Sequence, residues 1–376
     1  MIIGIDGNEA NVEKKVGISE YAFELLWQFS EFRNQKSLAS TNEAERVEFR
    51  IYLKEKPRDD LPKEINNWKY RIAHPRKLWT QFALPIDLYF HKPRPDIFFS
   101  PTHYAPRFSP IPTAISIMDL SYIHYPQMFK KSDLYQLKNW TLYSVKNAKK
   151  VFTISNASKD DIIKIYNQPE GKVVVTYPGI KSKMQKSELQ KEKFQREGKY
   201  ILFVGTLQPR KNIVRLIEAF SKIDKKDLSL VIAGKKGWLY EEILNAPKEL
   251  GIENRVKFLE FVSKEELEVL YQNALCLVLP SLYEGFGLPV LEAMKNGCPV
   301  IISNVSSLPE AGGDAALYVN PEDVNDIASK IRELINNEKL RKELIEKGYK
   351  QVKKFSWEKT AKETLKALEE IVKKKN

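Results

Sequence analysis

Two adjacent cations follow a strongly apolar stretch in the segment VGTLQPRKN (204–212). Arg210 and Lys211 stand just before an amphipathic stretch typical of a helix, and Asn212 is a residue type that caps helices well. Free backbone N–H groups and the helix dipole attract anions at a helix N-terminus. The two cations therefore belong either to an anion-binding site or to a solvated basic turn of the kind that is common in this chain.

Two glutamates accompany glycines in a second loop, PSLYEGFGLPVLEAM (280–294). Gly285 and Gly287 let the backbone approach a ligand closely, and Glu284 and Glu292 can face the same crevice. Carboxylates accept hydrogen bonds from the vicinal hydroxyls of a sugar or a ribose. Unless these are two unrelated exposed acids, the two loops together predict a site for a nucleoside diphosphate sugar.

Alternating strands and helices position both loops in the second half of the chain. Single helices between successive strands indicate right-handed crossovers and a parallel sheet, in which ligands bind at the carboxyl ends of the strands. The expected strands are 200–204, 228–233, 256–259, 275–279 and 299–302, and the expected helices are 213–223, 239–250, 264–273 and 289–296.

The first half of the chain shows a similar alternation, with a helix over 18–32 and strands over 2–5, 49–53, 97–99, 114–118, 151–154 and 173–175. We therefore expect an α/β protein with two Rossmann-like domains, whose parallel sheets face a cleft. The predicted boundaries are an N-terminal domain over 1–180, a charged linker over 181–198, a nucleotide-sugar-binding domain over 199–356 and a last helix within 357–376 that can pack back on the first domain.

Composition narrows the class of protein further. The 376 residues are 43% hydrophobic and 29% charged, which is a globular balance. Two cysteines exclude a disulfide framework, and the four histidines lack metal-ligand spacing. The apolar runs are too short to cross a membrane, and Met1 leads directly into a strand rather than a signal peptide. We expect a cytoplasmic protein.

The positive charge is concentrated in one region. The formal net charge is +12, and residues 63–150 hold fourteen Lys and Arg against five Asp and Glu among many aromatics. This pattern is typical of a solvated lysine-rich surface, of a surface that rests on anionic lipid at the inner face of a membrane, or of a nucleic-acid groove. No RNA-binding or zinc-finger signature is present, so we expect no nucleic-acid partner.

The second half resembles the retaining GT-B fold glycosyltransferases of family 4, which use nucleotide sugars. The resemblance covers nearly all of the second domain, and the two glutamates separated by seven residues are its most diagnostic feature. The matching stretches are VGTLQPRKN (204–212), LVIAGKKGW (230–238), VKFLEFVSKEEL (256–267), PSLYEGFGLPVLEAM (280–294) and SSLPEAGGDAALYVNP (306–321).

This resemblance implies a role for each matching residue of the second domain. Arg210 and Lys211 would hold the donor pyrophosphate, while Glu284 would contact the transferred sugar and Glu292 the ribose. The remaining donor-binding positions would line the phosphates, the sugar and the base; they are Gly205, Thr206, Val262, Leu267, Phe286, Gly287 and Leu288.

The first domain, which the family resemblance implies to be the acceptor side, matches the family less closely. Gly17 matches the glycine of the loop after the first strand, but the chain reads GISEY (17–21) where some relatives have Gly-Ile-Gly-Arg-Tyr. Relatives often carry His-Asp where this chain has Met118 and Asp119. A thioether cannot move a proton. Either the chemistry does not need that histidine or another group replaces it, with His103 the better candidate and His124 the second.

The resemblance further implies a hexosyltransferase that retains anomeric configuration by front-face transfer to a glycan acceptor, for which a lipid-linked glycan is one candidate. We expect no metal cofactor, because no Asp-x-Asp occurs and the pyrophosphate site has its own cations. The stretch GKKGWLY (234–240) favours mannose from GDP-mannose. Other readings are an epimerase-like or phosphorylase-like sugar-nucleotide enzyme, an inactive sugar-nucleotide-binding protein, and a nucleic-acid-binding protein.

Overall fold

The computed structural model describes residues 1–15, 17–32, 47–180, 199–260 and 262–374 and divides into two compact units. Unit 1 comprises Met1–His124, Phe129–Gly179 and Ser356–Asn376, and unit 2 comprises Tyr125–Met128 and Ile180–Phe355. The expected linker over 181–198 lies outside the described residues.

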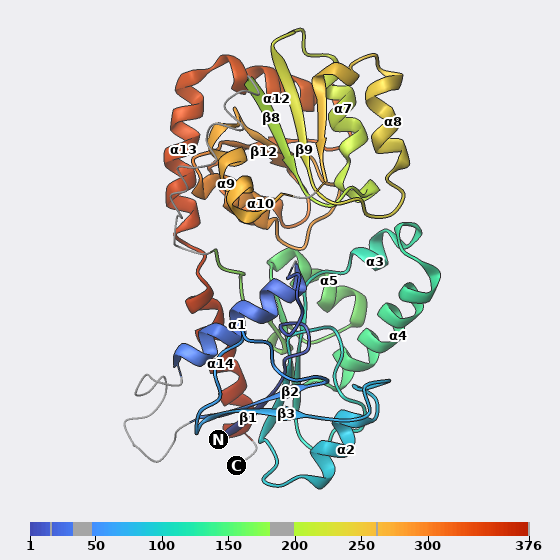
Figure 1. Ribbon diagram of the computed structural model, residues 1–376, viewed down its shortest axis with the longest axis vertical. Helices are drawn as coiled ribbons and strands as arrows, with labels where there is room; N and C mark the ends of the chain where they lie inside the picture. Colours follow the sequence, from blue (N-terminus) through green and yellow to red (C-terminus); the bar gives the residue numbers. More distant parts are fainter. Residues whose placement is uncertain (16, 33–46, 181–198, 261, 375–376) are drawn as a thin grey trace. The chain divides into compact units, whose positions relative to one another are not determined.

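Unit 1 is built on a seven-stranded parallel sheet with the order β3-β2-β1-β4-β5-β6-β7 (Figure 1). Its strands are β1 (Ile2–Asp6), β2 (Glu48–Leu53), β3 (Trp68–Ile72), β4 (Ile97–Ser100), β5 (Thr113–Ile117), β6 (Lys150–Thr153) and β7 (Val173–Val175). Its helices are α1 (Ile18–Phe32), α2 (Ala83–Phe90), α3 (Ser121–His124), α4 (Lys131–Asn147), α5 (Asn156–Tyr166) and α14 (Trp357–Lys373).

Alternate side chains of this sheet pack into hydrophobic cores on its two faces, because successive residues of a strand point to opposite sides. On β4, Phe99 packs in the cluster that includes α1 and α14, whereas Phe98 packs in the cluster that includes α2. On β5, Ile115 and Ile117 contribute to a third cluster with α4 and α5. Helices therefore cover both faces of the sheet, as in a doubly wound fold.

The last helix, α14, belongs to unit 1 although the chain reaches it only after unit 2. It lies beside α1 (Figure 1), and the rings of Tyr21 and Trp357 meet edge to face at 5.8 Å. Gly179 makes the return of the chain possible, because a Cβ there would lie 1.9 Å from the backbone nitrogen of Trp357.

Unit 2 contains a six-stranded parallel sheet with the order β10-β9-β8-β11-β12-β13. Its strands are β8 (Lys199–Val204), β9 (Leu228–Ala233), β10 (Val256–Leu259), β11 (Leu277–Leu279), β12 (Val300–Ser303) and β13 (Ala316–Val319). Its helices are α7 (Ile213–Ser221), α8 (Glu241–Glu249), α9 (Lys264–Asn273), α10 (Leu288–Lys295), α11 (Leu308–Gly312), α12 (Val324–Asn336) and α13 (Glu338–Val352).

The prediction of two parallel-sheet α/β domains is confirmed, and most of the expected elements occur within one to three residues of their expected ends. The sequence reasoning missed β3, β13 and the helices α11 to α13. The pattern did not predict β3 because this strand lies at the edge of the sheet. Its sequence, WKYRI, has Lys69 and Arg71 in place of an apolar run.

Within the described ranges, no helix has both the length and the apolar character needed to cross a bilayer. The same ranges bring together no group of three or more His, Cys, Asp and Glu side chains suited to a metal ion.

Candidate functional site

The loops that follow β8 and β9 are held against each other at the carboxyl edge of the unit 2 sheet. The N–H of Leu207 donates to the carbonyl of Lys235 at 3.0 Å, and the N–H of Gly237 donates back to Leu207 at 3.1 Å. Gly234 permits this approach, because a Cβ at that position would lie 1.9 Å from the carbonyl oxygen of Gly205. Two predicted donor-binding residues, Gly205 and Thr206, therefore lie on a loop with little freedom.

Three charged residues meet between the loop after β8 and the loop after β11. The Nζ of Lys211 lies 2.5 Å from Oε1 of Glu284, and Nη1 of Arg210 lies 3.4 Å from its Oε2. Arg210 also donates to the carbonyl of Tyr283 at 2.9 Å. The hydroxyl of Ser281 donates to Glu284 at 2.7 Å. The structure thus joins the predicted cations and one predicted carboxylate in a single cluster.

Glu284 is ionised at neutral pH despite its burial. Burial by itself would raise the pKa of its carboxyl group, but the charges of Lys211 and Arg210 and the hydrogen bonds from Lys211 and Ser281 outweigh that effect and hold the pKa below its usual range. The cluster therefore contains two cations and one anion, with a net charge of +1 in a buried place.

Asn212 supports this cluster in a way that differs from the prediction. It occupies the N-cap position of α7, but its backbone is left-handed, with φ of 60°, and its side chain makes no capping hydrogen bond. The amide instead donates to the carbonyls of Pro280, at 2.9 Å, and Pro321, at 2.6 Å. Asn212 therefore connects three separate loops, and the expected capping role is wrong.

The loop after β11 leads directly into α10. Gly287 is the N-cap, with φ of 102°, and a Cβ there would lie 2.7 Å from a methyl group of Leu308. Leu288 opens the helix, and the ring of Phe286 is buried edge to face against Phe355 at 5.3 Å. The hydroxyls of Ser306 and Ser307 donate to the carbonyl of Glu284, at 2.7 and 2.8 Å. The backbone of the glycine loop is therefore fixed on both sides.

Glu292 has different surroundings from Glu284. It is half-buried on α10 and accepts a hydrogen bond at 3.0 Å from the hydroxyl of Tyr271 on α9. Burial and the neighbouring Glu292 carboxylate raise the pKa of Tyr271, so this hydroxyl stays protonated and donates. Sequence reasoning missed Tyr271, since nothing near α9 in the sequence signals a partner on α10.

Val262 and Leu267, the residues predicted to flank the base, are both half-buried at the start of α9. Ser263 caps this helix in a capping box with Glu266. The backbone N–H of Leu267 bonds to the carbonyl of Ser263 at 2.9 Å, which fixes the first turn beside these two side chains.

In unit 1 the predicted residues follow three neighbouring strands. Gly17 lies in the loop after β1 with φ of 57°, His103 follows β4, and Asp119 follows β5. Near Gly17, the hydroxyl of Ser19 donates to a carboxylate oxygen of Glu9 at 3.0 Å.

His103 and Asp119 come close enough to interact. Burial lowers the pKa of the His103 imidazole, and the charge of Asp119 offsets part of this decrease. The imidazole stands beside the rings of Tyr104 and Tyr122, with both centroid separations 6.2 Å, and its buried Nδ1 has no hydrogen-bond partner among the described residues.

The other two positions considered for the missing histidine have different surroundings. The side chain of Met118 packs against the apolar core of unit 1, and its carbonyl accepts a bond from Ser158 at 3.1 Å. The Nε2 of His124 lies 2.8 Å from a carboxylate oxygen of Asp161. Asp119 thus acts electrostatically on His103, whereas His124 pairs with Asp161.

These two parallel-sheet units match the GT-B class of solved glycosyltransferase structures. Sucrose-phosphate synthase from Thermosynechococcus elongatus superposes with a TM-score of 0.75 at 18% identity, over 98% of each chain. WaaG, described as a glycosyltransferase involved in lipopolysaccharide biosynthesis, superposes with a TM-score of 0.70 at 15% identity, over 97% of this chain and 98% of its own. At these identities the likeness establishes the fold.

Sequence comparison identifies the family. Residues 184–351 match the family Glycosyl transferases group 1. O-antigen chain mannosyltransferase B from Escherichia coli is 33% identical over 309 residues, covering 79% of this chain and 78% of that protein. O-antigen chain mannosyltransferase RfbU from Salmonella typhimurium is 33% identical over 220 residues, covering 58% of this chain and 60% of that protein. The chain belongs to the group 1 family of glycosyltransferases.

Proposed function

We propose that this glycosyltransferase is a retaining mannosyltransferase of family 4 that moves mannose from GDP-mannose to a glycan acceptor carried on a lipid at the inner face of a membrane. The mannosyltransferase relatives support the choice of sugar. The observation that carries the proposal is the buried cluster of Lys211, Arg210 and Glu284, because its net positive charge complements a diphosphate while its carboxylate complements a sugar hydroxyl.

In this proposal each charge has one partner on the donor. Lys211 and Arg210 meet the pyrophosphate and stabilise the negative charge that grows on it as the sugar leaves. Glu284, ionised and fixed by Ser281, accepts a hydrogen bond from a hydroxyl of the transferred sugar. Glu292, oriented by Tyr271, accepts from the ribose.

Backbone and apolar groups would complete the donor pocket. The N-terminus of α10, at Gly287 and Leu288, adds N–H donors and its dipole for the phosphates, and Gly205 and Thr206 line the opposite loop. Phe286 shapes the sugar pocket, and Val262 and Leu267 contact the base. Gly17 gives the loop after β1 the left-handed backbone that it needs near phosphates and acceptor.

The proposed chemistry is front-face transfer. The leaving phosphate accepts the acceptor proton, and catalysis comes from stabilising the departing diphosphate and from positioning the acceptor. His103, neutral because of burial, and Asp119 are proposed to hold the acceptor hydroxyl. The cations of the cluster take the place of a metal in this scheme, so we propose that transfer survives EDTA; loss of transfer that manganese restores would contradict this.

Calorimetric titration with GDP, UDP and ADP tests the donor site. Wild type is expected to bind GDP most tightly, and Glu292→Ala is expected to weaken that binding, because the ribose loses a charge-assisted hydrogen bond of about 1.5–3 kcal/mol. Glu346→Ala removes an exposed glutamate on α13 and serves as the control. Tighter binding of UDP or ADP would show that the donor carries uracil or adenine instead of guanine. If no nucleotide binds, the proposed donor site is wrong.

A second candidate is a sugar-nucleotide-binding protein without transferase activity, which Met118 favours because a core-packed thioether cannot do the work of a histidine. Turnover distinguishes the two. Incubation with GDP-mannose and a lipid-linked glycan, followed by NMR of the product's anomeric proton, should show a new α-mannoside. Tight GDP binding with no product would favour the second candidate.

A further inference from the structure

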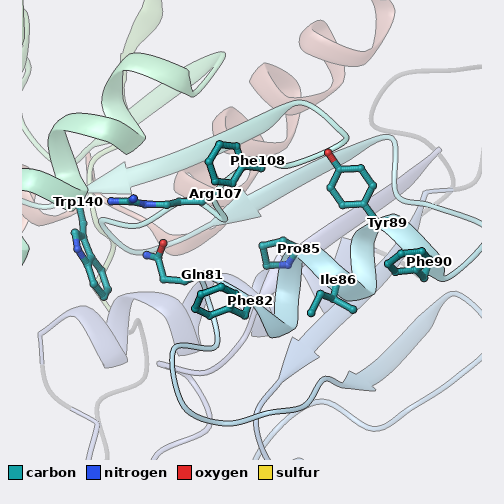
Figure 2. A pocket seen from close by; sticks show the side chains of 9 residues that line it. All are labelled: Gln81, Phe82, Pro85, Ile86, Tyr89, Phe90, Arg107, Phe108 and Trp140. Carbon is teal, nitrogen blue, oxygen red and sulfur yellow. The ribbon is translucent and has the colours of Figure 1, made fainter.

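An apolar pocket of about 460 Å³ lies on unit 1, and one of its walls is the loop between β4 and β5, which also carries His103. It is bounded by α2, by the loop of Arg107 and Phe108, and by Trp140 of α4 (Figure 2). Pockets of this size hold small apolar ligands or single chains of larger ones. We call its surroundings the α2 patch, defined by Leu78, Phe82, Ile86, Phe90, Arg107 and Phe108.

Helix α2 is apolar on both of its faces. One face is buried with Trp79 and Phe98 in a core cluster. The other face leaves Phe82, Ile86 and Phe90 in solvent, with Phe90 79% exposed, and Figure 2 shows these side chains projecting from the helix. A helix that is apolar all round is normally buried all round, and eight residues are far too few to span a bilayer. The exposed face therefore needs an apolar partner.

Backbone strain at the edges of the patch pushes two more apolar side chains outward. Leu78 and Phe108 have φ of 49° and 52°, a left-handed conformation that bulky residues rarely adopt. Phe108 is 75% exposed, and its N–H donates to the hydroxyl of Tyr143 at 3.2 Å. Strain of this kind persists at functional surfaces more often than elsewhere.

Cations outnumber carboxylates on the segment that carries the patch. The buried Nε of Arg107 has no hydrogen-bond partner among the described residues, and its guanidinium lies over the ring of Tyr143. Lys77 and Lys92 are exposed on the same segment. The two carboxylates within residues 65–110 are already used, since Asp87 accepts from Arg71 and His91 and Asp96 accepts from the N–H of Ile2. The partner of this surface should be both apolar and anionic.

We propose that the α2 patch docks onto an anionic lipid bilayer. Arg107 meets a lipid phosphate at the pocket, and Phe82, Ile86, Phe90 and Phe108 enter the acyl boundary, as in interfacial helices that combine apolar burial with cationic attraction. A second copy of the chain fits less well, because two-fold pairing would bring the same cations together.

Docking of this kind would bring the protein to a lipid-linked acceptor. This benefit rests on the proposed function, whereas the docking does not. The docking itself depends on unit 1 alone. It can therefore fail while nucleotide binding in unit 2 succeeds, and the reverse also holds.

Vesicle flotation with the full chain tests the docking. Wild type is expected to float with vesicles of phosphatidylcholine and phosphatidylglycerol and to float poorly with phosphatidylcholine alone or at high salt. Phe90→Ser should lower the partition coefficient by about tenfold, which corresponds to the burial of one phenylalanine side chain. Arg107→Gln and Lys77→Glu should lower it selectively for the anionic vesicles.

Matched controls come from unit 2. Leu250→Ser removes another exposed apolar side chain, and Lys226→Glu makes the same charge change as Lys77→Glu; both should float like wild type. GDP titration on every variant shows that unit 2 is intact. Absence of wild-type flotation, equal flotation on neutral vesicles, or variants that float like their controls would each overturn the proposal. A dimer that Phe90→Ser dissociates, without vesicle binding, would make the patch a self-association surface instead.

Discussion

Lys211 is a buried cation whose ammonium group pairs with Glu284. A buried pair of this kind adds little to stability, since the loss of hydration offsets most of the Coulomb attraction. In the proposed mechanism its contribution is electrostatic preorganisation, because charges that are fixed before the reaction need no rearrangement in the transition state.

Lys211→Ala should therefore lower turnover at saturating donor by about a hundredfold, or roughly 3 kcal/mol of barrier. Acceptor KM should change far less. Steady-state kinetics with GDP-mannose measures both quantities. Because the single variant leaves Glu284 buried without its main partner, Lys211→Ala combined with Glu284→Gln is the control for folding. Turnover that equals wild type in the single variant would remove Lys211 from the mechanism.

Asp6, at the end of β1, is a buried carboxyl group with the opposite pKa shift to Glu284. Burial raises its pKa to about 6, against hydrogen bonds from Asn8 that lower it. Between about pH 4 and 6 the folded state thus holds a proton that the unfolded state has released. The free energy of unfolding should therefore fall as pH rises through this window, by up to about 3 kcal/mol.

Asp6→Asn removes this titration and keeps an oxygen that can accept from Asn8. Its stability relative to wild type should therefore grow from pH 4 to pH 7. Urea unfolding of both proteins at several pH values measures the difference between their free energies of unfolding. The contributions of the other titrating groups cancel in this difference. A difference that is constant with pH would show that burial does not perturb Asp6.

At the scale of elements, the donor loops depend on close backbone contact between the ends of β8 and β9. Gly234→Ala would place a methyl group 1.9 Å from the carbonyl oxygen of Gly205, so one loop must move. We expect lower thermal stability and a severalfold loss of GDP affinity, because the cation loop continues directly from Gly205.

Gly171→Ala is the matched control, since a Cβ there meets no atom within 4 Å and its backbone is not left-handed. Calorimetry with GDP and a thermal melt of both variants measure the two effects. Wild-type GDP affinity in Gly234→Ala would show that the two loops tolerate separation.

At the scale of the whole molecule, the chain finishes unit 1 only with α14, after it has completed unit 2. Leu368 of α14 is fully buried in the core that also contains Ile3 and Phe99. Leu368→Ala should cost about 2–5 kcal/mol of stability, because it opens a cavity in a packed core. The exposed neighbour Lys366→Ala should cost little.

Hydrogen exchange with mass spectrometry can locate this loss. Peptides of β1 and β4 should exchange faster in Leu368→Ala, while peptides of β8 and β11 keep their protection. GDP affinity should stay at its wild-type value. Equal loss of protection in both units would show that they unfold as one cooperative body, contrary to this expectation.

The sequence alone determined the class of fold and the proximity of three predicted donor-site residues. Apolar runs separated by single amphipathic helices define parallel sheets, and the residues just after a strand must lie at its carboxyl edge; for this reason Arg210, Lys211 and Glu284 could be predicted as neighbours. These inferences need only the local period of the chain and the spacing of loop residues.

Tertiary structure decided the partners of those residues. The bond from Tyr271 to Glu292, the bridge made by Asn212 and the packing of Met118 each join segments whose separation along the chain carries no signal. The α2 patch could not be predicted for the same reason, since the sequence does not distinguish buried from exposed aromatic residues. Burial and hydrogen-bond partners depend on long-range packing, whereas the period of a strand or helix is a local property of the backbone.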